Sequence, residues 1–179
     1  NALIGIGTVY SGYLNEPENA TQYFQQAEKA FQKANDIEGL MMVYGNMGAI
    51  YSNTGNLRAG LAETFKAEKI IRTNGLIDFE AQVLSTISAI YSEMDSIPQA
   101  LEYAEKARLA FLRDKDLMRY GDHLLYMSTI FIKNNDDVGA EKYALEAVET
   151  GLQGQHKVIV QDAYLTNVVI VFDEYGRHV

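Results

Sequence analysis

Apolar residues recur along the chain with the 3.6-residue period of helices, and short polar segments separate the apolar stretches. Large apolar residues four positions apart, such as Met47 and Tyr51, would share one helix face and pack between paired helices. Cap and turn residues such as Asn74 and Gly75 interrupt this period. The pattern predicts helices over about residues 3–14, 17–34, 37–53, 57–73, 78–94, 97–113, 117–133, 138–151 and 157–174.

Small residues recur at a fixed spacing of 40 positions. Two such series in register over four copies indicate an internal repeat, and small side chains at these sites would let paired helices approach closely. We expect a single array over residues 1–179, with repeats at about 1–35, 36–75, 76–115 and 116–154 and a half repeat at 155–179. The two series are Ala27, Ala67, Ala107 and Ala147, and Ala20, Gly60, Ala100 and Ala140.

The spacing within each copy resembles the tetratricopeptide repeat (TPR). This resemblance implies an all-α fold, a right-handed α-α superhelix with four helix pairs plus one unpaired C-terminal helix. The chain departs from the family in its 40-residue period, against 34, and in lacking the closing proline, which indicates a long-helix bacterial variant. HEAT-type repeats share the longer period but would not explain the glycine and tyrosine spacing of the second copy. The matching residues are Tyr44, Met47, Gly48, Tyr51 and Gly55 in the second copy and Ala20, Phe24 and Ala27 in the first.

The TPR resemblance also implies a concave groove, lined by the first helix of each repeat, that holds a peptide or protein segment. Most side chains at the groove positions are small, polar and uncharged, so they could hydrogen-bond an extended peptide backbone. Lys133 is the one cation in the set, which does not fit a clamp for a terminal carboxylate. The set is Asn46, Ala49, Ser52, Asn53, Gln82, Ser85, Thr86, Ala89, Ser92, Glu93, Asp122, Leu125, Tyr126, Thr129, Lys133, Thr166 and Asn167.

Composition narrows the classes of function. A net charge of −9 disfavours a nucleic-acid partner, and no apolar run is long enough to insert into a membrane. The chain has no cysteine, and His123, His156 and His178 are isolated, without the paired spacing of helical zinc ligands. The six methionines recur at core-like spacing, so we expect them to pack in the interior. The sequence therefore predicts no enzyme and no cofactor, and it assigns no compartment.

A protein- or peptide-binding scaffold is the function that this pattern favours. The chain starts with Asn-Ala and stops within a repeat, so we expect it to be the sensory or regulatory segment of a larger bacterial signalling protein. The alternative is a structural spacer or self-association module without a peptide ligand. In that alternative a homodimer would form through the last helix, whose apolar residues Leu165, Val168, Val169 and Phe172 would otherwise face water.

Overall fold

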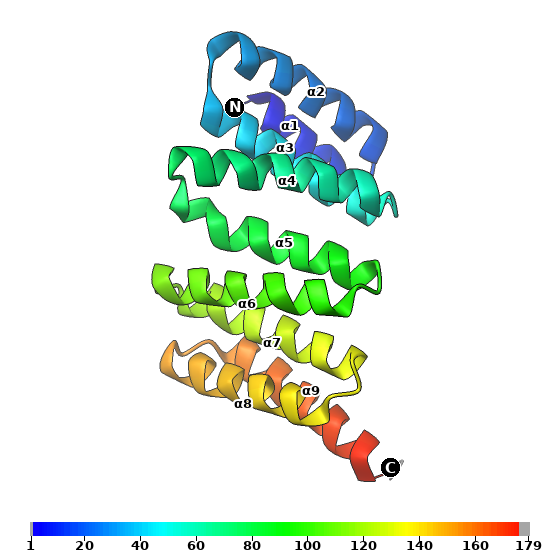
Figure 1. Cartoon of the computed structure of the whole chain (residues 1–179), viewed down its shortest axis with the longest axis vertical. Coiled ribbons are helices and arrows are strands. Elements are labelled where there is room, and N and C mark those ends of the chain that lie inside the picture. The colour runs from blue at the N-terminus through cyan, green and yellow to red at the C-terminus, as the bar shows by residue number, and fades with distance from the viewer. Residues whose placement is uncertain (1, 176–179) are drawn as a thin grey trace. The chain divides into compact units, whose positions relative to one another are not determined.

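The computed structural model describes the backbone of residues 2–175 and the side chains of residues 2–166. In this part of the chain nine α-helices and one 3-10 turn follow one another, and no strand is present (Figure 1). The all-α fold, with four helix pairs and one further helix, is confirmed. The chain divides into two compact units, Asn1–Met94 (unit 1) and Asp95–Val179 (unit 2). The expected single array over residues 1–179 stays a prediction.

Unit 1 contains two antiparallel helix pairs and the first helix of a third. Each helix packs against the next, and α3 also contacts both α1 and α5 (Figure 1). The bounds are α1 (Ala2–Gly12), α2 (Pro17–Ala34), α3 (Ile37–Asn53), α4 (Leu57–Asn74), η1 (Ile77–Phe79) and α5 (Glu80–Glu93).

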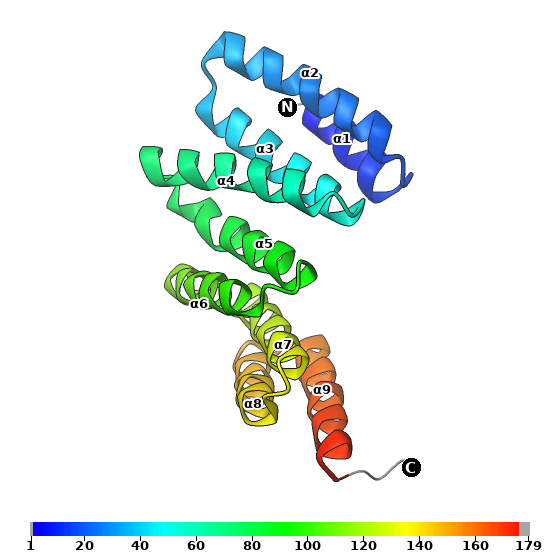
Figure 2. The ribbon, with the colours of Figure 1, turned by 45° about the vertical axis from the view of Figure 1, so that its right-hand side comes forward.

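Unit 2 contains the remaining four helices. The last of them, α9, packs against both α7 and α8 (Figure 2). The bounds are α6 (Ile97–Asp114), α7 (Leu117–Lys133), α8 (Asp137–Gln153) and α9 (Lys157–Tyr175).

One helix begins differently from the sequence-based expectation of about residue 78. At the starts of α3 and α7, the side chains of Asp36 and Asp116 accept a backbone N–H of the first turn, at 2.8 and 3.0 Å. The corresponding residue of the intervening repeat is Leu76, which offers no side-chain acceptor. The chain enters this helix through the 3-10 turn η1 instead, and α5 begins at Glu80.

The turns between helices each contain one residue with a left-handed backbone. Positive φ angles recur every 20 residues, so the chain reverses direction with the same device after first and second helices alike. Six of these eight positions hold Gly, Asn or Asp, which tolerate this conformation best. The residues are Asn15, Asn35, Gly55, Gly75, Asp95, Lys115, Asn135 and Gln155, with φ between 54° and 79°.

The two series of small residues lie in the interior. The seven alanines are at most 1% exposed, and Gly60 is also buried. Gly48 lies at the α3–α4 crossing, where an added Cβ would be 3.2 Å from the carbonyl oxygen of Gly60 and would also meet the Thr64 side chain. The expectation that small side chains permit close packing is therefore confirmed for these positions.

Two glycines of α3 should respond in opposite ways to the same substitution. Gly48→Ala should lower the free energy of unfolding by about 1–3 kcal/mol, because the new methyl group overpacks the crossing with α4. Gly45→Ala should raise it by up to about 1 kcal/mol, because nothing lies within 4 Å of the added Cβ and alanine favours the helix. Urea denaturation of both variants checks this, and equal effects would contradict it.

Candidate partner-binding groove

Unit 1 has a hollow of about 310 Å³ between α3 and α5. This volume lies near the lower end of the range for ligand pockets, so it could hold one or two side chains. Thr64 of α4 and Phe79 of η1 complete its wall. The lining residues are Met41, Met42, Gly45, Asn46, Ala49, Thr64, Phe79, Gln82, Val83 and Thr86.

The lining of this hollow is apolar or uncharged, and its polar groups are largely occupied. Asn46 Nδ2 donates to the carbonyl oxygen of Met42 at 2.7 Å. The Thr64 hydroxyl donates to a carbonyl within α4 at 2.8 Å, and the Thr86 hydroxyl donates to the carbonyl of Gln82 at 3.0 Å. Because these donors bond their own helices, the hollow offers a ligand mainly apolar contact and acceptor oxygens.

The structure brings four residues of the predicted groove into this hollow: Asn46, Ala49, Gln82 and Thr86. Ser52 lies instead at the α3–α4 crossing, where it approaches Gly60 and donates to the carbonyl of Gly48 at 2.9 Å. The other predicted positions of unit 1 are exposed or half-buried on α3 and α5 outside the lining, namely Asn53, Ser85, Ala89, Ser92 and Glu93.

Six residues of the hollow were absent from the predicted set: Met41, Met42, Gly45, Thr64, Phe79 and Val83. Met42 could have been found from the sequence, because it precedes Asn46 and Ala49 by four and seven positions on one helix face. Phe79 could not, because it reaches the hollow from a 3-10 turn where the sequence predicted an α-helix. Met41 is 3% exposed and serves the core as expected, although it also borders the hollow.

The predicted positions of unit 2 that the structure describes lie in several different surroundings. Asp122 borders a separate hollow of about 540 Å³ between the N-terminal parts of α7 and α9. Burial, and to a smaller extent the Asp162 carboxylate, raise the pKa of Asp122 above its ordinary value. Leu125 is half-buried, and the half-buried Tyr126 ring lies 5.7 Å from the His123 ring.

Three further predicted positions of unit 2 bond within the unit. Thr129 donates to the carbonyl of Tyr126 at 2.7 Å, and Lys133 pairs with Asp95 at 3.1 Å. Thr166 donates to a carbonyl one turn earlier in α9 at 2.9 Å. The side chain of Asn167 lies outside the described residues.

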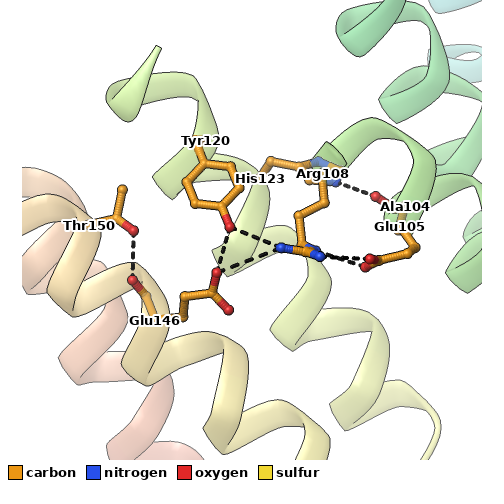
Figure 3. Close-up of polar contacts among 7 residues, drawn as sticks. All are labelled: Ala104, Glu105, Arg108, Tyr120, His123, Glu146 and Thr150. Atoms are coloured by element: carbon orange, nitrogen blue, oxygen red, sulfur yellow. Dashed lines mark hydrogen bonds and ion pairs between the residues drawn. The ribbon is translucent and has the colours of Figure 1, made fainter. Parts of the chain in front are cut away.

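A polar network joins α6, α7 and α8 in unit 2 (Figure 3). Arg108 donates two hydrogen bonds to Glu105, at 2.7 and 2.8 Å, and a third to the Tyr120 hydroxyl at 3.1 Å. That hydroxyl donates to Glu146, whose carboxylate lies 3.8 Å from Arg108. The hydrogen bonds from Arg108 lower the pKa of Glu105, whereas burial raises the pKa of Tyr120. The network is a link between helices, since its charges are already paired.

Unit 1 contains a related link, in which the positions of the acidic and basic residues are exchanged relative to unit 2. The Tyr44 hydroxyl of α3 donates to Glu28 of α2 at 2.9 Å, and the Lys66 ammonium of α4 lies 5.0 Å from the centre of the Tyr44 ring. Positions 28 and 66 correspond to Arg108 and Glu146 two repeat periods later. In both units, therefore, a tyrosine of a first helix connects opposite charges on the two second helices beside it.

His123 of α7 is a buried histidine rather than a surface one, at 3% exposure. Its Nε2 lies 2.8 Å from the carbonyl oxygen of Ala104, and because a carbonyl only accepts, Nε2 carries the proton. The ring packs beside Phe111 at 5.1 Å. Burial lowers the pKa of His123 below its ordinary value of 6.5. The hydrogen bond to the Ala104 carbonyl opposes this shift, Arg108 adds to it, and Glu105 opposes it. His178 lies outside the described residues.

The free energy of unfolding should decrease as the pH is lowered below about 6.5. In this range the unfolded chain binds a proton at His123, whereas the folded chain, in which the pKa of His123 is lower, does not yet bind it. The slope contributed by this group is at most about 1.4 kcal/mol per pH unit. Urea denaturation of the chain at several pH values checks this. The variant His123→Gln should lose this pH dependence of the free energy of unfolding, and the control His156→Gln should retain it. An unchanged pH dependence in His123→Gln would show that another group causes it.

Within residues 2–166, no group of three or more histidines and carboxylates could hold a metal ion. None of the described helices combines the length and apolar character required to cross a membrane.

Comparison with protein-family models and with curated protein sequences gave no match. Aspartyl phosphate phosphatase F from Bacillus subtilis has a similar fold, with a TM-score of 0.86 and 12% identity over 94% of this chain and 44% of that chain. A Signal Transduction ATPase with Numerous Domains protein with a tetratricopeptide repeat sensor, from Pyrococcus horikoshii, is also similar, with a TM-score of 0.63 and 19% identity over 96% of this chain and 33% of that chain.

The chain thus spans less than half of the length of these two proteins. The TPR-like repeats of a Podosopora anserina kinesin light chain are similar over 97% of this chain and 95% of that one, with a TM-score of 0.73 and 9% identity. At these identities the likeness concerns the fold, and it agrees with the repeat spacing of the sequence. The chain therefore has a TPR-like helical-repeat fold.

Proposed function

We propose that the chain is a binding module that holds an extended peptide or protein segment along α3 and α5 of unit 1. The observation that carries this proposal is the hollow of about 310 Å³, because it coincides with four of the groove positions that the TPR resemblance implies. Extended segments suit such a site, since their alternate side chains can enter a hollow while the backbone meets polar groups at its rim.

A regulatory role in a larger bacterial signalling protein is the second part of the proposal. Support comes from the proteins that contain this fold as one part of a longer chain. One is an aspartyl phosphate phosphatase and another is a signal transduction ATPase with a tetratricopeptide repeat sensor. In such a protein, a partner bound at the repeats would act on the remaining part of the chain by preferring one of its conformations.

Gly45 provides a precise means of blocking the hollow. It lies on the lining within α3, and nothing lies within 4 Å of the position that a Cβ would take. A larger side chain at this position would therefore project into the hollow without overpacking the helix core. Gly5 of α1 is a matched control, because it is also a helical glycine of unit 1 with open space around its Cβ position.

A displayed library of random linear peptides, selected on the wild-type chain, tests the binding proposal. Peptides enriched on the wild type should bind Gly45→Leu at least about tenfold more weakly, a loss of about 1.4 kcal/mol, and should bind Gly5→Leu unchanged. Fluorescence anisotropy of the labelled peptides gives the affinities. The proposal fails if no peptide is enriched, or if enriched peptides bind all three proteins equally.

Self-association through α9 is a second candidate function. Val158 and Leu165 lie seven residues apart on one face of α9 and are 70% and 57% exposed. Exposed apolar residues that share one helix face favour an interface. The side chains of Val168, Val169 and Phe172, which the sequence also assigned to this interface, lie outside the described residues.

Light scattering over a wide range of concentrations tests this second candidate. If α9 forms an interface, the wild type should dimerise as concentration rises and Leu165→Lys should remain monomeric, because the charge would have to be buried. Leu109→Lys is the matched control, since Leu109 is 54% exposed on α6. A wild type that stays monomeric, or a dimer that survives Leu165→Lys, would exclude this interface.

A further inference from the structure

The hollow of unit 1 also contains information on the chemical class of its occupant. No Asp, Glu, Lys or Arg is among its lining residues. A charged side chain entering it would lose water without gaining an opposite charge, which is strongly unfavourable when burial is complete. An uncharged apolar side chain has no such penalty and is stabilised in proportion to the apolar surface that it removes from water.

The apolar wall is suited to side chains of more than one shape. Met41 and Met42 of α3 lie in the same hollow as Phe79 of η1 and Val83 of α5. Methionine side chains are flexible and polarisable, so they can adapt to an aliphatic or an aromatic partner. The volume of about 310 Å³ exceeds what one such side chain fills, which leaves room for the ligand backbone at the rim.

The polar rim favours a ligand that donates hydrogen bonds. Asn46 uses an N–H on the carbonyl of Met42, and the Thr86 hydroxyl uses its hydrogen on the carbonyl of Gln82. The side-chain oxygen of Asn46 is therefore suited to accept a hydrogen bond, as peptide N–H groups require. Gln82 is exposed and can both donate and accept.

From these observations we infer that the hollow anchors one uncharged apolar side chain of the bound peptide, of the size of Leu, Met or Phe, while Asn46 accepts from the peptide backbone. This inference rests on the proposed peptide binding and adds the identity of the anchoring residue. The lining selects against acidic and basic side chains at the anchor position alike, because it supplies a counter-charge for neither.

A positional scan of a library-derived peptide that depends on Gly45 tests the inference. Each position is replaced in turn by Leu, Asp and Lys. One position should accept Leu with less than about a threefold change in Kd and lose at least about tenfold with either Asp or Lys. A peptide that binds in the Gly45-dependent manner but tolerates both charges at every position would overturn the inference and leave the proposed function standing.

The variant Gln82→Glu tests the charge preference of the hollow by changing the protein instead of the peptide. Gln82 borders the hollow and is exposed, so an isosteric change should leave folding intact. The variant should improve binding of the peptide with Lys at the anchor position by about tenfold relative to wild type, through the new counter-charge. Gln26→Glu on the exposed surface of α2 should give no such gain. If Gln82→Glu and Gln26→Glu bind the Lys-containing peptide with equal affinity, the anchor lies outside this hollow and the inference is wrong. If no peptide depends on Gly45, the proposed function fails as well.

Discussion

Close contact between helices at small side chains is the constraint on which the rest of the structure depends. At the crossing of α3 and α4, Gly48 and Gly60 leave so little space that a single methyl group would collide with the opposite helix. Ala100 and Ala140 of unit 2 are fully buried at the positions that correspond to Gly60. Because close packing is short-ranged, these contacts fix the separation of each pair, and larger apolar residues can then fill the remaining interior.

The sequence was sufficient to predict most of the fold, because helix period, small residues and caps act locally and repeat. Asp36 and Asp116 cap the starts of α3 and α7, a role for which aspartate is a preferred residue. The start of α5 differed, since a leucine occupies the capping position there and a 3-10 turn replaces the first helical turn. An α-helical and a 3-10 first turn differ little in energy, so the residue at the capping position can decide between them. Hydrophobic periodicity alone does not distinguish these two turns.

The candidate site was less accessible to sequence reasoning. Family-based positions identified Asn46 and Gln82, but the hollow also depends on Thr64 from a second helix and Phe79 from a turn. Their presence there depends on the path of the chain between helices. The paired charges that join neighbouring helices through Tyr44 and Tyr120 were also missed, because the tyrosines stand at different positions of the repeat. The charged residues of the two links stand at corresponding repeat positions, but their signs are exchanged and the tyrosines are out of register.

The left-handed residue in every turn has a consequence for altering the length of the protein. Since these residues recur every 20 positions, one 40-residue module contains two complete reversals of the chain. Whole modules excised or duplicated at these residues would retain every helix length, whereas insertion of a few residues inside a helix would rotate one face away from its neighbour. Lys115 and Gln155 adopt this backbone at an expense of about 1 kcal/mol or more each, so glycine at these two sites would be a natural starting point for a sturdier scaffold.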